Sequence, residues 1–256
     1  MLIEIPHLPH RPAKPRNIGL TMVMDKGLSY REAEDMISVS GIYVDFVKLG
    51  FGTSLVTPEV HKKILLYKEA GLRPYLGGTL FEAFIVRNMF DEYFSLLRKL
   101  DLDMVEVSDG SFEIDQKDKV DYIKRLADSF LVISEVGSKK SDVIYTPEEW
   151  IGNMQSELDA GSFKVIAEAR ESGTTGIYNG DGSANTNLID RIAEDIDLDS
   201  ILWEAPLKSQ QTWFIKQFGA NVNLGNIAPS EVIALETLRT GLRGDTFFQF
   251  LPDSMK

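Results

Sequence analysis

Short apolar runs alternate with longer amphipathic stretches along the whole chain. Several of the short runs, such as residues 44–47 and 130–133, lack polar alternation, which is typical of strands that are buried on both faces of a parallel sheet. The pattern predicts eight strands, at residues 20–24, 43–49, 73–76, 104–107, 131–134, 164–167, 201–203 and 221–224.

Helix-end signals follow several of these strands. Thr57 and Pro58 suit an N-cap and a first helical position, and Gly71 suits the residue after the helix. Thr146 and Pro147 repeat the same start signal later in the chain. The predicted helices with the clearest signals are residues 30–40, 58–70, 147–160 and 229–240.

Eight strand-and-helix units in 256 residues predict a single (β/α)8 TIM barrel of the α/β class. The alternative is an open doubly wound sheet, which usually has fewer strands. No linker-like stretch divides the chain, so we expect one barrel domain at residues 19–250. Residues 1–18 contain four prolines and are expected to form an irregular N-terminal arm.

Composition narrows the functional classes. Lys and Arg total 27 and Asp and Glu total 39, a net charge of −12, which disfavours nucleic acid and anionic membrane surfaces as partners. The absence of cysteine excludes disulfides, thiolate zinc sites and cysteine nucleophiles. The sequence shows neither a run that reaches the roughly 18 apolar residues of a spanning helix nor a signal-peptide pattern, so we expect a cytoplasmic protein.

Polar residues directly after the apolar runs are the candidates for a site, because reacting groups of parallel barrels lie at the C-terminal ends of the strands. The acidic candidates are Glu82, Glu106, Glu135, Glu168 and Glu204. A single glutamate there is ordinarily an ion-pair partner, but five at the same strand position are expected to converge on one mouth of the barrel. The basic candidates on this mouth are Lys26, Lys48, Lys139, Lys140, Arg170, Lys208 and Arg243.

These residue types suit a metal-assisted reaction of a small anion. Carboxylate oxygens bind hard cations such as Mg²⁺, and the metal-ligand candidates are Glu106, Glu135, Glu168 and Glu204. Barrels often hold phosphate in the loops after strands seven and eight. The candidate substrate-binding residues are Lys26, Arg170, Lys208, Ser209, Gln210, Asn223, Asn226 and Arg243. The three histidines lie away from the strand ends, so no histidine general base is expected.

Nine ordered blocks of the sequence resemble the phosphosulfolactate synthase family, and together they run from residue 19 to residue 246. Three of the blocks read VDFVKLGFGTS at residues 44–54, GGTLFE at residues 77–82 and EAPLKSQQ at residues 204–211. The other blocks are residues 19–27, 105–111, 134–137 with Lys139, 168–173, 222–227 and 241–246.

The resemblance implies a TIM barrel that uses Mg²⁺, acts as a carbon–sulfur lyase and adds sulfite to phosphoenolpyruvate. The product would be (2R)-phospho-3-sulfolactate, on a route to coenzyme M or to sulfolactate. The family places two lysines directly after the glycine that matches Gly137, whereas Ser138 intervenes here. Lys139 is therefore our first choice for the proton donor and Lys140 the second, with Lys48 and Lys26 next.

Two other functions remain open at this point. One is a non-catalytic or stress-related barrel of the same family, and the other is a Mg²⁺-dependent lyase or aldolase acting on another enolpyruvate-like anion. We also expect a homo-oligomer, and we expect the glycine-rich residues 171–187 to form a mobile lid over the substrate.

Overall fold

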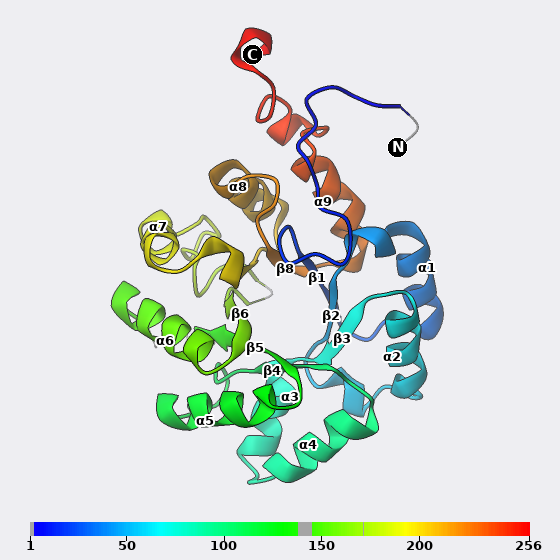
Figure 1. Ribbon diagram of the computed structural model, residues 1–256, viewed down its shortest axis with the longest axis vertical. Helices are drawn as coiled ribbons and strands as arrows, with labels where there is room; N and C mark the ends of the chain where they lie inside the picture. The colour runs from blue at the N-terminus through cyan, green and yellow to red at the C-terminus, as the bar shows by residue number, and fades with distance from the viewer. Residues whose placement is uncertain (1–2, 138–144, 171) are drawn as a thin grey trace.

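The expected barrel is present in a computed structural model that describes residues 3–137, 145–170 and 172–256. Its strands are β1 (Thr21–Asp25), β2 (Phe46–Leu49), β3 (Arg73–Leu76), β4 (Met104–Val107), β5 (Leu131–Val136), β6 (Ser162–Ala167), β7 (Ile201–Glu204) and β8 (Leu224–Ile227). They form one parallel sheet in the order β3-β2-β1-β8-β7-β6-β5-β4. The two outermost strands, β3 and β4, pack against each other and nearly close the barrel (Figure 1). The prediction of a single (β/α)8 TIM barrel is confirmed.

Helices surround the sheet on its outer face (Figure 1). They are α1 (Tyr30–Ser40), α2 (Val60–Glu69), α3 (Gly78–Ile85), α4 (Phe90–Lys99), α5 (Gln116–Ala127), α6 (Pro147–Asp159), α7 (Thr186–Asp195), α8 (Lys208–Phe218) and α9 (Val232–Arg239). In the part of the chain that the structure describes, none of the helices combines the length and the apolar character needed to cross a membrane.

Side-chain capping marks the start of some helices and not of others. Thr146 caps α6 through a capping box with Glu149, as its sequence predicts. The prediction that Thr57 caps α2 is wrong: the Thr57 hydroxyl donates to the Thr53 carbonyl, and α2 begins three residues later at Val60. Glu59 precedes that helix with a φ of 53°, which breaks the helical path between Pro58 and Val60.

Two apolar layers pack on opposite faces of the sheet. The larger one lies between the strands and the surrounding helices. The smaller one fills the barrel interior and consists of Leu20, Met22, Phe46, Tyr75, Met104, Ile133, Ile166 and Leu202. Because side chains alternate between the two faces of a strand, the inner layer fixes which later residues also point into the barrel.

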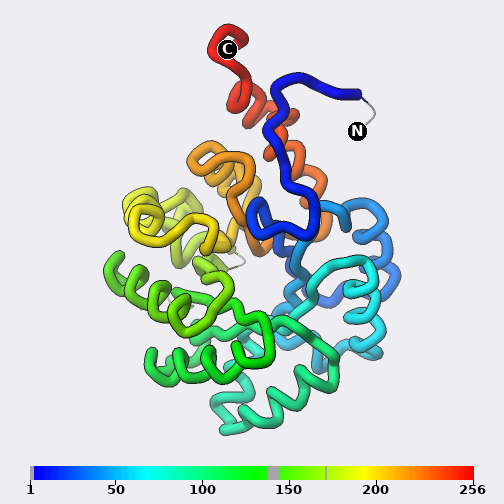
Figure 2. The backbone as a smooth tube through the Cα atoms, in the orientation of Figure 1, coloured from blue at the N-terminus to red at the C-terminus, as the bar shows by residue number. Residues whose placement is uncertain are grey.

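The N-terminal arm, residues 3–18, contains no strand or helix and runs along the side of the barrel where α9 lies (Figure 2). Arg16 pairs with Asp45 at 2.8 Å, and Arg11 pairs with Glu236 of α9 at 2.9 Å. Both pairs are nearly buried, so the arm is fixed against the barrel even though it lacks secondary structure.

Candidate active site

At the ends of five of the eight strands, the barrel interior changes from apolar to charged within two residues. Met104, Ile133 and Leu202 belong to the inner apolar layer, and the next inward positions are two residues further along the strands. The charged residues at these positions are Lys48 on β2, Glu106 on β4, Glu135 on β5, Glu168 directly after β6 and Glu204 at the end of β7. The period of two therefore collects one ammonium and four carboxylates at the C-terminal end of the barrel.

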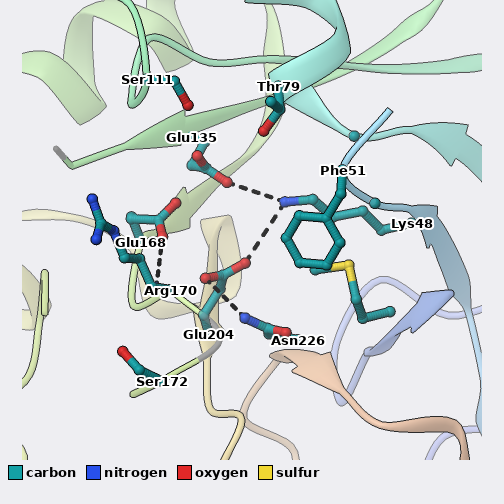
Figure 3. A pocket seen from close by; sticks show the side chains of 13 residues that line it. Lys48, Phe51, Thr79, Ser111, Glu135, Glu168, Arg170, Ser172, Glu204 and Asn226 are labelled. Carbon is teal, nitrogen blue, oxygen red and sulfur yellow. Dashed lines mark hydrogen bonds and ion pairs between the residues drawn. The ribbon is translucent and has the colours of Figure 1, made fainter. Parts of the chain in front are cut away.

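Lys48 lies at the centre of this layer. Its Nζ is 3.0 Å from Glu106 Oε1, 3.1 Å from Glu135 Oε2 and 3.7 Å from Glu204 Oε1. Figure 3 shows the ammonium directed between the Glu135 and Glu204 carboxylates. Burial disfavours the charged ammonium, but the three carboxylates outweigh burial and raise the pKa of Lys48 well above its usual value. Lys48 is therefore a permanent positive charge inside the barrel.

Backbone amides orient Glu106 and Glu168. Gly78 N–H donates to Glu106 Oε1 at 2.6 Å, and Arg170 N–H donates to Glu168 Oε1 at 2.6 Å. Gly78 must be glycine here, because a Cβ would lie 2.2 Å from Ser108 Oγ and 2.6 Å from Glu106 Oε1. The close approach of this backbone thus gives the Glu106 carboxylate a donor that a bulkier residue could not supply.

Glu204 is held from two sides. Its Oε2 accepts hydrogen bonds from Ala169 N–H at 3.1 Å and from Asn226 Nδ2 at 3.3 Å. Its backbone carbonyl accepts from the Tyr178 hydroxyl at 2.6 Å. The position of Glu204 is consequently set by β8 and by the chain that follows β6.

A cavity of about 680 Å³ opens above the charged layer, large enough for a small phosphorylated molecule. Its described lining residues are Met24, Lys48, Gly50, Phe51, Gly77, Thr79, Ser111, Glu135, Glu168, Arg170, Ser172, Glu204 and Asn226. Phe51, Arg170 and Asn226 have φ values of 56°, 51° and 57°, a conformation that costs about 1 kcal/mol or more per non-glycine residue. Such strain concentrates at ligand-binding sites, which supports this cavity as the functional one.

Several predicted site residues line this cavity, and others do not. Lys48, Arg170, Asn226 and three of the predicted metal ligands line it, whereas Glu106 lies beneath it. Lys26 and Ser209 are exposed outside it. Lys139 and Lys140 are outside the described residues.

Glu82 is on α3 and not at a strand end, so the expectation that it shares the position of the other glutamates is wrong. It is buried, and its carboxylate accepts hydrogen bonds from Ser108 Oγ, from Ser111 N–H at 2.7 Å and from Phe112 N–H at 2.8 Å. Glu82 therefore shapes the loop after β4, and Ser111 of that loop lines the cavity.

Asn223 lies at the opposite end of the barrel from the position expected. Strand β8 begins at Leu224, three residues later than its predicted start, so Asn223 precedes it. Its Oδ1 accepts from Leu20 N–H, and its Nδ2 donates to the carbonyls of Asp199 and Ile201, all beside the starts of β1 and β7. Asn223 therefore links the N-terminal ends of β1 and β7, and it cannot reach the cavity at the C-terminal end of the barrel.

Lys208 and Arg243 meet outside the cavity. Lys208 Nζ is 2.8 Å from Asp245 Oδ1, and Arg243 Nε is 3.5 Å from Asp245 Oδ2. Lys208 begins α8, and Arg243 follows α9 instead of a strand. Asp245 thus brings these two cations together outside the cavity, and the expected phosphate site remains a prediction.

Gln210 holds the glycine-rich segment that follows β6. Its buried Nε2 donates to the carbonyls of Gly173 at 2.8 Å and Gly182 at 3.1 Å. Tyr178 and Ala184 pair as an antiparallel bridge within this segment. Residues 172–185 therefore fold as a hairpin tied to the barrel, and the expected lid movement remains a prediction.

Sequence reasoning did not select Phe51, Thr79, Ser111 and Ser172, which line the cavity. Thr79 and Ser111 follow predicted strands and carry hydroxyl groups, a signal that could have found them. Phe51 carried no such signal, because an exposed apolar side chain between Gly50 and Gly52 is also typical of an ordinary turn.

The carboxylate set fits a divalent cation by charge and donor type, since oxygen ligands without histidine or cysteine suit Mg²⁺. Among the residues that the structure describes, no three acidic or histidine side chains are already arranged to hold a metal ion. Glu135, Glu168 and Glu204 reach the cavity, so a metal would meet carboxylates from β5, β7 and the residue after β6.

The fold has many relatives among solved structures. Thiamine phosphate pyrophosphorylase from Pyrococcus furiosus superposes with a TM-score of 0.54 at 11% identity, covering 87% of this chain and 97% of that one. At this level of identity the likeness concerns the barrel architecture alone.

Sequence relatives are much closer. The chain is 46% identical to phosphosulfolactate synthase of Methanocaldococcus jannaschii, over 90% of this chain and 94% of that protein. It is 41% identical to phosphosulfolactate synthase of Bacillus subtilis, over 94% of this chain and 97% of that protein. The family model of (2R)-phospho-3-sulfolactate synthase (ComA) matches residues 9–245. The chain belongs to the phosphosulfolactate synthase family.

Proposed function

We propose that this protein adds sulfite to phosphoenolpyruvate to form (2R)-phospho-3-sulfolactate. The observation that carries the proposal is the buried ring of Lys48 and four glutamates at the barrel mouth, in a chain at least 41% identical to phosphosulfolactate synthases over nearly its full length. The names of these relatives support the product, and the charged cavity supports a small polyanionic substrate.

The reaction forms one carbon–sulfur bond and releases no leaving group. The sulfur lone pair of sulfite attacks the methylene carbon of phosphoenolpyruvate, and the double-bond electrons move toward the carboxylate. The α-carbon then takes a proton on one face. The protein must therefore stabilise added charge on the carboxylate and deliver a proton at a fixed position.

Cationic groups of this chain are proposed to bind the two anions. Arg170, three residues after the end of β6, lines the cavity. Lys48 lines the cavity and keeps its positive charge there, where it offsets the repulsion between the Glu106 and Glu135 carboxylates. Met24 and Phe51 supply an apolar wall that limits water near the reacting carbons.

We propose Mg²⁺ as the cofactor, with Glu135, Glu168 and Glu204 as the residues that would hold it. The sequence also makes Glu106 a metal-ligand candidate. We do not include it in the metal site, because it lies beneath the cavity and binds Lys48 and the Gly78 amide there. A bound divalent cation would stabilise negative charge that develops on the substrate carboxylate. The residues of the chain orient the substrate and supply the proton.

Lys139 remains the proposed proton donor, and Lys140 is the alternative. Both follow β5, whose residue Glu135 is part of the charged ring. Lys48 fits the donor role less well, because the carboxylates that raise its pKa hold its proton strongly.

The decisive experiment combines pure protein with phosphoenolpyruvate, sulfite and Mg²⁺ and follows products by phosphorus NMR and mass spectrometry. We expect phosphosulfolactate, and no product when sulfite is omitted. Stable phosphoenolpyruvate with no new product would favour a non-catalytic barrel, whereas turnover of another enolpyruvate-like anion alone would favour a different lyase or aldolase. Sedimentation of the same sample tests the proposed homo-oligomer, and the proposed cytoplasmic location needs cell fractionation.

A further inference from the structure

Lys119 of α5 is a buried charged residue on the outer side of the barrel wall. Only 1% of it is exposed. Its Nζ is 2.8 Å from Asp109 Oδ1, 2.8 Å from Glu157 Oε1 and 2.7 Å from the backbone carbonyl oxygen of Glu135. One ammonium thus connects the loop after β4, the end of β5 and helix α6.

Stability alone is a weak reason for this arrangement. Removing two or three charges from water costs several kcal/mol per ion, and buried ion groups replaced by apolar residues often leave stability unchanged or improved. Burial would lower the pKa of Lys119, but Glu157 and Asp109 outweigh it, so this pKa lies above its usual value. Lys119 therefore keeps its positive charge inside the barrel wall.

The pairing register of β5 explains why Lys119 donates a hydrogen bond to the Glu135 carbonyl. The pairing of β4 with β5 ends at Val107 and Ser134, whereas the pairing of β5 with β6 continues to Val136. Glu135 therefore lies one residue past the last residue of β5 that pairs with β4. Its buried carbonyl needs a donor, and Lys119 Nζ takes the place of a strand amide.

The same residue carries a side chain into the charged ring. The Glu135 carboxylate is 3.1 Å from Lys48 Nζ on the inner face, while its carbonyl meets Lys119 on the outer face. Asp109, the second partner of Lys119, stands two residues before Ser111, which lines the cavity. Lys119 consequently fixes two neighbouring strand ends that both contribute to the site.

We propose that Lys119 is a positioning residue, which sets the Glu135 carboxylate beside Lys48 and holds the loop that carries Ser111 at the cavity. This inference rests on the proposed function for its kinetic readout. In this proposal Lys119 does not contact the substrate. Replacing Lys119 should therefore lower kcat more than it weakens substrate binding.

The test must separate positioning from folding, because Lys119→Met alone would leave Glu157 buried and uncompensated. We therefore compare Glu157→Gln, which keeps the contacts of Lys119 to Asp109 and Glu135, with the double variant Lys119→Met/Glu157→Gln. The control should keep kcat within about twofold of wild type. The double variant should fold, as far-UV circular dichroism checks, and should lose about 10- to 100-fold in kcat with a similar KM for phosphoenolpyruvate. The variant Lys119→Arg/Glu157→Gln, which restores a donor, should recover part of that loss.

A folded double variant with wild-type kcat would overturn the proposal. If the double variant does not fold, Asp109→Asn decides: a lower kcat at an unchanged melting temperature supports positioning, and an unchanged kcat contradicts it. Amide hydrogen exchange gives a readout that does not need activity. Amides at residues 107–111 and 134–137 should exchange about tenfold faster in the double variant than in Glu157→Gln, and equal rates would refute the inference even if wild-type protein lacked the proposed activity.

Discussion

Replacing Lys48 by methionine tests the electrostatic design of the site most directly. Methionine keeps much of the side-chain volume but removes the ammonium from between Glu106, Glu135 and Glu204. Three buried carboxylates would then face one another without that charge. We expect the variant to be much less stable at neutral pH, apart from any loss of activity.

The magnitude follows from the distances. At 3.0 to 3.7 Å, each ammonium–carboxylate pair corresponds to about 4.5 to 5.5 kcal/mol at an effective dielectric constant of about 20. Most of this offsets the desolvation of the buried groups, so the pairs do not add up. Breaking a buried ion pair by removing one partner typically costs about 3 to 5 kcal/mol, and we expect a loss of that size in unfolding free energy.

The pH dependence has a definite sign. Without Lys48, burial and mutual repulsion raise the folded-state pKa of the carboxylates above their unfolded values. A group with a raised folded pKa favours the folded state at low pH, and this contribution is lost as pH rises through that pKa. The deficit of Lys48→Met relative to wild type should therefore be larger at about pH 7.5 than at about pH 5.5.

Urea denaturation at both pH values, in buffer free of divalent cations, measures the deficit. Lys208→Met is the matched control, because it removes a lysine whose side chain is 43% exposed beside Asp245 and should cost less than about 1 kcal/mol. A deficit for Lys48→Met no larger than that of the control, or equal at both pH values, would refute the reasoning.

Four further predictions concern single features of the site. Gly78→Ala would place a Cβ 2.2 Å from Ser108 Oγ, so urea denaturation should show a loss of about 2 kcal/mol in unfolding free energy and assays a lower kcat. Tyr178→Phe removes the hydroxyl that donates to a carbonyl at the end of β7 and should cost about 1 kcal/mol by the same measurement; no loss would mean that this bond is not stabilising. Exhaustive chelation should abolish turnover, and full activity would remove the metal from the mechanism. Lys139→Met should lower kcat about 100-fold with phosphoenolpyruvate still bound, measured against Lys140→Met; the reverse result would make Lys140 the donor.

The fold and the core of the site were predictable because each depends on a short-range period. Unbroken apolar runs mark strands that are buried on both faces, and eight of them that alternate with helices favour a parallel barrel over an open sheet. Glu106, Glu135 and Glu204 lie two residues after inward apolar side chains, so the alternation of a strand places them inside the barrel. Their convergence on Lys48 follows from the same alternation on β2.

Register and loop paths could not be predicted in this way. A shift of three residues at the start of β8 moved Asn223 to the other end of the barrel, because the apolar run before it did not show where pairing begins. Gln210 is a predicted substrate-binding residue, but its amide donates to the carbonyls of Gly173 and Gly182. Lys119 shares the buried face of α5 with Ile123 and Leu126, but the helix sequence does not show which groups its ammonium meets.

The charge balance of the ring connects the remaining proposals. Glu106, Glu135, Glu168 and Glu204 carry four negative charges when ionised, and the Lys48 ammonium offsets one of them. A chain with a net charge of −12 gives anionic substrates no long-range attraction, so the cations at the mouth must overcome repulsion locally. A divalent cation on the cavity-facing carboxylates would offset two further charges, and Arg170, which lines the cavity, would add positive charge where an anionic substrate binds. The metal and Lys139 are proposed to act at different points of the reaction, so chelation is expected to impair the attack by sulfite and Lys139→Met the proton transfer that follows.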